Sequence, residues 1–422
     1  MKKIISALLA VLLPGLLIGC QPAAEQSSAT EAAVHKEIFP DASLFDSETN
    51  ITLKVSVPPE ETALTKKQVE RFISHYPAIS FEQIEVREQN GGESAFLIMS
   101  DPEAKNDIFY TTTNDLYKEI NAQLLAPVDK AFSEKVRSEH IPEAVAAAEA
   151  DGVLYAYPEE TNGVCLVYDP SVVSAEDAKT FEGVLAACQK AGRQFVMDVG
   201  NGFFASCFTL TGGVVPDGFE DDGVTQKFKA YDEDEAVQTL MAFAKLMKQY
   251  RGTFVNTDPG LIAGAIKSGT VAAGIDGVWR QGAYDSSIGA AKLPTVTVNG
   301  KAKQPVSLSD YRVLCVDKSC KFPKTAQALA YYLTSEGCQR ERAEEFGCAP
   351  TVANLQTAFP DKPMLQAAAA QSPYTVATGG LSGIYWTATG KLGGTLYTDE
   401  SIADDAAAAK KLLQSTIQEI AQ

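Results

Sequence analysis

Apolar and polar residues alternate through residues 51–57, ITLKVSV, and this pattern predicts a β-strand with one buried face. A second alternating run covers residues 79–87, and a short apolar run at 107–110 predicts a third strand. Apolar side chains at helical spacing predict a helix over residues 63–76. Strand, helix and strand therefore alternate, and this order predicts the parallel sheet of an α/β fold.

Polar residues follow the first and third strands, in the loop at 58–61 and in the cluster TTTND at 111–115. In open α/β sheets, ligands bind beyond the carboxyl ends of the strands, so we expect both segments at the rim of a binding site. The same patterns predict a later strand at 311–316 and helices at 233–249, 324–334 and 403–420.

One stretch, residues 265–294, combines several such signals. A short helix end stops at Ser268-Gly269, an apolar run at 271–275 predicts a strand, and Asp276-Gly277 ends it just before Trp279. A tryptophan presented at the tip of a strand favours a role facing a ligand. The competing interpretation is that Trp279 is a packed core residue, as most large aromatics are.

Length and composition narrow the class of protein. A chain of 422 residues predicts two or three domains, and 45% apolar with 21% charged residues is typical of a soluble globular protein. Acidic residues outnumber basic ones by 54 to 36, for a net charge of −18. Such a surface disfavours nucleic acid and anionic ligands as partners.

The N-terminus has the pattern of a secretion signal. Lys2 and Lys3 precede an apolar run at 4–18, too short to span a membrane comfortably, which ends in LIGC at Cys20. This resembles a bacterial lipobox and predicts a signal peptide over 1–19, with lipidation of Cys20 and anchoring outside the bacterial cell membrane. An ordinary signal peptide or a short membrane anchor are the alternatives. Residues 20–47, rich in small polar residues, are predicted to be a flexible tether.

The number and spacing of the cysteines do not predict a metal site. Seven cysteines remain besides Cys20, an odd number that cannot pair completely, and no CxxC pair occurs. Cys165 and Cys315 lie in apolar runs and are predicted to be small core residues. Bridges between Cys338 and Cys348, or between Cys315 and Cys320, stay open.

Several motifs together resemble the extracellular carbohydrate-binding proteins of ABC importers, of the maltodextrin-binding type. The first is Ser268-Gly269, then IDGVW ending at Trp279, then GAAKLP at 289–294. The second is GVLYAYP at 152–158 followed by VCLVYD at 164–169. The resemblance covers nearly all of residues 48–422.

This resemblance implies a two-lobed α/β fold, the type II periplasmic-binding-protein-like fold, with a ligand cleft between the lobes and a hinge of crossing segments. The first lobe would comprise 48–158 plus 310–360, and the second 163–306 plus 364–422. Residues 159–163 are the hinge candidate. A monomer would close its lobes on a sugar and deliver it to a membrane permease, without a cofactor.

Carried over position by position, the resemblance implies stacking aromatics at Trp279, Tyr385 and Phe203, with Trp386 as the platform if the register shifts by one residue. It implies sugar hydroxyl contacts from polar side chains: Asn114, Asp115, Asn162, Asn201 and Glu60. Thr111 stands where maltodextrin binders have an aromatic, Asn162 and Asn201 where they have carboxylates, and Asp115 where they have arginine. A short or differently hydroxylated glycan is therefore as compatible as maltodextrin, and both asparagines, flanked by glycine, also fit plain turns.

Two other functions stay open. The same fold could bind a polyamine or another organic cation in acidic, aromatic surroundings. A surface-anchored glycoside hydrolase would need two carboxylates about 5 to 10 Å apart. The acidic runs at 220–222 and 232–235 favour solvated or helix-capping roles instead. The sequence therefore predicts a binding protein rather than an enzyme.

Overall fold

The computed structural model describes residues 37–89, 95–101 and 105–421. The predicted signal peptide, Cys20 and the first part of the tether lie outside the described residues. Within the described ranges, no helix has the length and apolar character that a membrane span requires.

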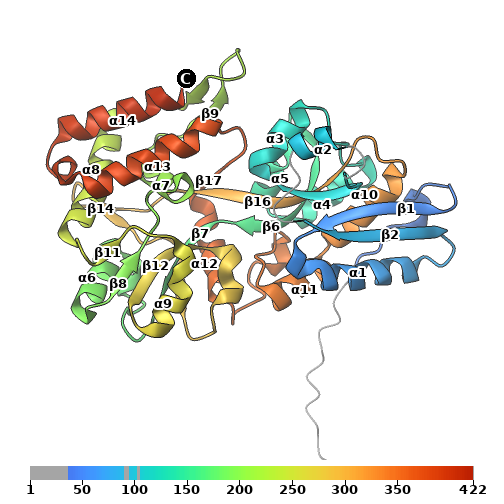
Figure 1. Ribbon diagram of the computed structural model, residues 1–422, viewed down its shortest axis with the longest axis horizontal. Helices are drawn as coiled ribbons and strands as arrows, with labels where there is room; N and C mark the ends of the chain where they lie inside the picture. Colours follow the sequence, from blue (N-terminus) through green and yellow to red (C-terminus); the bar gives the residue numbers. More distant parts are fainter. Residues whose placement is uncertain (1–36, 90–94, 102–104, 422) are drawn as a thin grey trace, which may run out of the picture. The chain divides into compact units, whose positions relative to one another are not determined.

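The first sheet has the strand order β17-β16-β3-β1-β2, and β6 also pairs with β16. Its strands are β1 (Ile51–Val57), β2 (Phe81–Glu88), β3 (Ile108–Thr112), β6 (Ala156–Asn162), β16 (Ser307–Val316) and β17 (Thr375–Ala377). β1 runs parallel to both β2 and β3, which confirms the predicted strands and their parallel arrangement. The predicted first helix is α1 (Thr62–His75), and Figure 1 shows it beside β1 and β2.

A core of buried apolar residues joins this sheet to its helices, and includes Val55, Phe72 and Phe109. The helices of this part are α2 (Ala95–Ser100), α3 (Thr113–Asn121), α4 (Lys130–Glu139), α5 (Pro142–Ala147), α10 (Pro323–Leu333) and α11 (Glu336–Phe346). Residues 111–115, predicted as one polar cluster, are divided between the end of β3 and the first turn of α3.

The second sheet has the order β11-β8-β12-β7-β13. Its strands are β7 (Val164–Tyr168), β8 (Gln194–Val196), β11 (Phe254–Val255), β12 (Val271–Gly277) and β13 (Gly289–Ala291). All of β12 is buried, as expected for the central strand of a covered sheet. The surrounding helices are α6 (Phe181–Ala191), α7 (Gly202–Thr211), α8 (Glu233–Gln249), α9 (Ile262–Ser268), α12 (Pro363–Gln371), α13 (Gly383–Thr398) and α14 (Ala406–Ile420). Figure 1 shows α13 and α14 side by side.

The hinge candidate at 159–163 is mostly strand. β6 continues to Asn162 and pairs with β16, and only Gly163 separates it from β7 in the other sheet. Arg312 on β16 binds Glu159 and Glu160, so both carboxylates are buried within the sheet.

Part of the predicted tether is also ordered. The ring of Phe39 stacks on His75 with centroids 3.8 Å apart, and Phe45 is buried against Phe72. Glu37 forms an ion pair with Arg71. Residues 37–47 therefore belong to the first core, because their aromatic side chains find apolar surface that composition alone did not reveal.

All seven described cysteines are free thiols, so neither of the two open bridges forms. Cys165 and Cys315 are fully buried, which confirms their predicted role as small core residues.

Candidate functional site

Three aromatic side chains from distant parts of the chain meet in one cluster. Phe203 comes from the first turn of α7, Trp279 from the 3₁₀ turn η5 (Val278–Ala283), and Trp386 from the first turn of α13. The Phe203 ring centroid lies 5.8 Å from that of Trp279 and 6.4 Å from that of Trp386. We call this set the aromatic platform. Trp279 is 42% exposed, so the interpretation as a packed core residue does not hold.

The exposed indole of Trp279 is held by the turn that carries it. A Cβ atom at Gly277 would lie 2.2 Å from the indole, so the ring rests directly over the backbone at Gly277, which only glycine allows. The buried Asp276 accepts hydrogen bonds from the Gly277 amide at 2.7 Å, the Tyr284 hydroxyl at 2.6 Å and Arg280 Nε at 3.1 Å. These bonds fix the turn and thus the direction of the indole.

A close crossing brings the other two rings together. A Cβ atom at Gly202 would lie 2.2 Å from the carbonyl oxygen of Trp386, so α7 and α13 approach at a glycine. Tyr385, predicted as a stacking residue, is only 1% exposed and packs in an apolar cluster with Leu210 and Leu308. On α13 it is therefore Trp386 that joins the platform.

The predicted hydroxyl-binding residues lie at several places. Asn114 and Asp115 lie in the first turn of α3, where Asp115 forms an ion pair with Lys118 at 2.6 Å. Thr111 is buried and donates to Glu119, so its hydroxyl is already used inside the fold.

Asn201 caps α7, accepting from the amide of Phe203 at 3.0 Å, which agrees with the turn interpretation and also places it beside the platform. Asn162 ends β6, and Glu60 is exposed in the 3₁₀ turn η2 (Pro59–Glu61). Across the described part of the chain, Glu60, Asn114, Asp115 and Asn162 form no hydrogen bond or ion pair with one another.

A buried ionic cluster, which sequence reasoning missed, lies near the hinge candidate. Arg312 binds Glu61 at 2.7 Å and 3.1 Å, Glu159 at 2.7 Å and Glu160 at 3.1 Å, and Arg342 binds both Glu61 and Glu159. Burial alone would raise the pKa of Glu61, but the two guanidiniums hold that pKa below its usual value. Burial raises the pKa of Glu160 to about 7.

This cluster does not form a cation site. Glu61, Glu160 and Cys348 place potential ligand atoms within 4.8 Å of one another. However, the Glu61 carboxylate already binds two guanidiniums, whose positive charges would repel a metal ion.

Asp310 is a further buried carboxylate that the sequence analysis did not single out. One of its oxygens accepts from the Thr113 hydroxyl at 2.7 Å, the Thr378 hydroxyl at 2.9 Å and the backbone N–H of Asn114 at 3.2 Å. Burial raises the pKa of Asp310, and these hydrogen bonds oppose the rise. The available signal was a charged residue one position before the strand predicted at 311–316, on the same face of the alternating pattern as Arg312.

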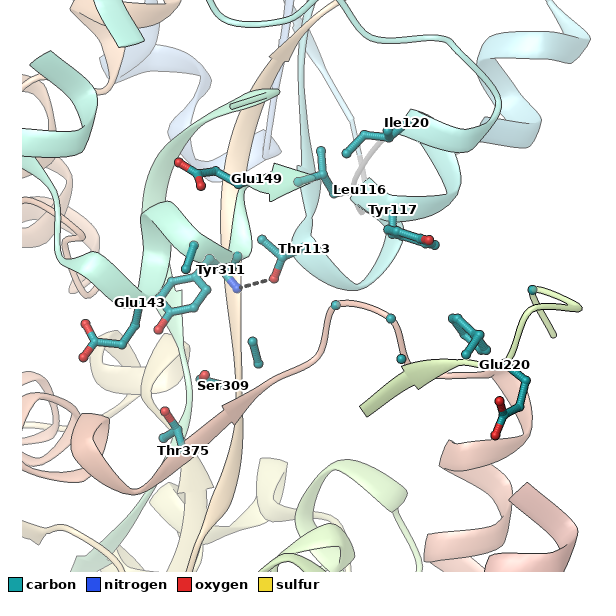
Figure 2. Close-up of a pocket in the computed structure, with 18 residues that line it drawn as sticks. Thr113, Leu116, Tyr117, Ile120, Glu143, Glu149, Glu220, Ser309, Tyr311 and Thr375 are labelled. Atoms are coloured by element: carbon teal, nitrogen blue, oxygen red, sulfur yellow. Dashed lines mark hydrogen bonds between the residues drawn. The ribbon is translucent and has the colours of Figure 1, made fainter. Parts of the chain in front are cut away.

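A separate cavity has a volume of about 630 Å³, and Figure 2 shows the residues that line it. Ser309 and Tyr311 of β16 line it, and they alternate with Asp310 and Arg312, so the cavity lies on the other face of the strand from the ionic cluster. Its lining residues are Thr113, Leu116, Tyr117, Ile120, Glu143, Ala146, Ala147, Glu149, Gly218, Phe219, Glu220, Gly223, Ser309, Tyr311, Thr375, Ala377, Gly379 and Gly380. This set contains three carboxylates and, among described residues, no basic side chain. None of the platform residues belongs to it.

The comparisons with known proteins agree with this fold. The family described as bacterial extracellular solute-binding protein matches residues 81–371. No curated protein sequence matches the chain.

Solved structures resemble the chain over nearly their whole lengths. The maltodextrin-binding protein MalE1 from L. casei BL23, solved without ligand, has a TM-score of 0.76 at 21% identity, covering 89% of this chain and 100% of the other. A cyclo/maltodextrin-binding protein complexed with maltotetraose has a TM-score of 0.67 at 22% identity, covering 89% and 100%. The Thermus thermophilus maltotriose-binding protein, bound with maltotriose, has a TM-score of 0.65 at 19% identity, covering 88% and 99%. These likenesses show a two-lobed α/β fold.

Proposed function

The chain belongs to the bacterial extracellular solute-binding proteins, and from this premise we propose that it captures a short oligosaccharide at the aromatic platform and delivers it to the permease of an ABC importer. Family membership identifies it as a binding protein that works outside the cytoplasm. The sugar, the permease and the membrane anchor are the proposed part.

The platform is the observation that carries this proposal. Sugar rings present apolar C–H faces and hydroxyl edges, so a sugar site combines aromatic planes with amide or carboxylate groups. Phe203, Trp279 and Trp386 supply the planes, and Trp279 is exposed on a rigid turn. Asn201 lies next to Phe203 and would supply a first polar contact.

Polar groups from the first lobe would complete the site. Asn114, Asp115 and Glu60 follow strands of the first sheet, where ligands of α/β sheets bind, and Asn162 lies at the passage to β7. Within the described part of the chain, the Asn114 side-chain oxygen is buried without a hydrogen-bond partner. Two solved relatives of the same fold hold maltotetraose and maltotriose, which favours a short α-glucan among the sugars to be tested.

Capture would proceed by closure of the two lobes about the hinge candidate. The proposed lobes are 48–158 plus 310–360 and 163–306 plus 364–422, with residues 37–47 added to the first by their packing. A sugar held by both lobes would bind the closed form more tightly and shift the population toward it. The closed monomer would then dock on the permease. Cleavage before Cys20 and lipidation of its thiol would keep the protein beside the membrane.

A thermal-shift and calorimetric test with maltotriose and maltotetraose addresses the proposal. A sugar at 100 times its Kd should add about 2.7 kcal/mol to the free energy of unfolding. Trp279→Ala should weaken binding by about 1 to 2 kcal/mol, roughly 5- to 30-fold, because a stacking plane is lost. Tyr374→Ala is the matched control, since Tyr374 is also exposed, at 37%, but lies outside the platform.

Unchanged affinity in Trp279→Ala would move the sugar away from the platform, and cleavage of the glycan would overturn the binding-protein function. The cavity of Figure 2 favours one second candidate, an organic cation, because three carboxylates line it and, among the described residues, only that of Glu149 forms an ion pair, with Arg137. Stabilisation by spermidine and by no sugar would replace the first proposal with this one.

A further inference from the structure

A short segment, residues 378–382 (TGGLS), joins the two halves of the proposed sugar site. It begins after β17, which pairs with β16 of the first sheet, and ends at Ser382, the N-cap of α13. The first turn of α13 carries Trp386 of the platform. We call this segment the strap. Gly380 adopts a φ of +77°, so two adjacent glycines give the strap little backbone stiffness of its own.

The N-terminal end of the strap is fixed to the first half of the site by Asp310. A single oxygen of Asp310 binds Thr378 of the strap together with Thr113 and Asn114 at the N-terminus of α3. The Thr378 amide also donates to the Ser309 carbonyl at 3.0 Å. An anionic acceptor suits this place because the N-terminus of a helix carries partial positive charge. The backbone of Asn114, whose side chain is a proposed sugar contact, is thus linked to the strap through the carboxylate of Asp310.

The C-terminal end of the strap is fixed by Gln226, at the start of β10 (Gln226–Phe228), which is only 2% exposed. Its amide nitrogen donates to the carbonyls of Gly218 at 2.7 Å and Gly380 at 3.2 Å. Its amide oxygen accepts from the Ser382 backbone amide at 2.8 Å. Between the two ends, Leu381 packs in the apolar cluster that contains Tyr385.

We propose that Asp310 and Gln226 are positioning residues of the sugar site, which hold the N-termini of α3 and α13 through the strap so that Asn114 and Trp386 act on one ligand. Neither side chain touches the sugar. They lower the cost of binding by ordering, before the ligand arrives, two groups that come from different sheets. This inference rests on the proposed function for the identity of the ligand, whereas the contacts of the strap are independent of that function.

Thr378→Val tests the strap with a nearly isosteric change that removes only the donor to Asp310. We expect the Kd for maltotriose to rise about tenfold, since hydrogen bonds to charged groups are the strong ones. Thr398→Val is the matched control, because Thr398 donates to the Gly394 carbonyl within the last turn of α13, at 2.9 Å, and lies outside both candidate sites. Its Kd should stay within about twofold of the parent value. Asp310→Asn keeps an acceptor oxygen and should weaken binding less than Asp310→Ala.

A second readout needs no ligand. The chain has two tryptophans, so Trp279→Phe leaves Trp386 as the only indole reporter. In that background, Thr378→Val should increase the fast motion of Trp386 in time-resolved fluorescence anisotropy, whereas Thr398→Val should not. If these bonds have a merely structural role, both variants should have a lower thermal midpoint, while their Kd and their anisotropy stay equal to those of the parent protein. That result would overturn the inference. If the parent protein binds no sugar, the proposed function fails. The anisotropy measurement still tests whether the strap orders Trp386, because it needs no ligand.

Discussion

At the scale of single residues, the buried ionic cluster shows how side chains far apart in sequence determine each other's charge. Three carboxylates, Glu61, Glu159 and Glu160, face two guanidiniums, Arg312 and Arg342. Fully ionised, the cluster would hold one unbalanced negative charge in a buried place. Burial accordingly raises the pKa of Glu160 to about 7, with Arg312 acting in the opposite direction.

The pH dependence of stability follows from this shift. Because the folded pKa of Glu160 lies above its ordinary value of 4.5, its contribution is fully present below pH 4.5 and is lost as the pH rises through about 7. We expect the free energy of unfolding, from urea titrations between pH 5 and 8, to fall more steeply with pH in the parent than in Glu160→Gln.

The comparison of the parent protein with Glu160→Gln separates the contribution of Glu160 to the pH dependence from those of other titrating groups. Burial lowers the pKa of His140 to about 3, which makes stability fall on the acid side, below about pH 6.5, in both proteins alike. Cys348, Glu61 and Glu159 face Glu160 in both proteins as well. Parallel pH profiles for the two proteins would contradict the assignment of a protonated Glu160.

At the scale of elements, the segment before β1 contributes to the first core although its composition predicts a tether. Phe39 stacks between His75 and Tyr332, and Phe45 packs against Phe72 and Tyr76. The 3₁₀ turn η1 (Ala42–Leu44) lies between these two rings in the chain. Isolated aromatics in a polar segment carry no periodic signal, so only their contacts identify this segment as part of the folded body.

Truncation measures that contribution. A chain that starts at residue 48 should be less stable than one that starts at residue 37 by about 3 to 5 kcal/mol, the loss usual for a buried phenylalanine. Chemical denaturation of the two chains gives the difference. The double variant Phe39→Ala and Phe45→Ala in the longer chain should reproduce most of it, and equal stability of both chains would show that the segment only rests on the surface.

At the scale of the whole molecule, the fold places the platform and the polar rim on elements of different sheets. Phe203, Trp279 and Trp386 belong to helices and turns around the second sheet, whereas Asn114 and Asp115 begin α3 after β3 of the first. A ligand that contacts both sets would therefore bridge elements of the two sheets. The strap and the passage at Gly163 connect the two sheets along the chain.

Closure should be visible in solution. Small-angle X-ray scattering should show a smaller radius of gyration with saturating maltotriose than without it, because the lobes approach. Trp279→Ala at the same sugar concentration should show a smaller change, in proportion to its lower occupancy. A saturated parent protein with an unchanged radius would contradict closure but not sugar binding.

The sequence by itself determined the local elements, and it favoured a ligand-facing Trp279 without excluding a packed core position. Apolar residues at every second position predict strands with one buried face, and apolar residues at helical spacing predict helices. These patterns predicted β1, β2, β3 and α1. The Asp276-Gly277 stop before Trp279 signalled a turn that presents the indole, because glycine is the residue that leaves room for the ring.

Only the tertiary structure decided which groups meet. Tyr385 and Trp386 are neighbours in sequence, and the packing of α13 against α7 made Trp386 the platform residue and buried Tyr385. The burial of Glu159 and Glu160 depends on Arg312, and the strap depends on Asp310 and Gln226, each remote along the chain. Periodicity reports the environment of one face of an element, whereas the partner of a buried charge is fixed by how separate elements pack.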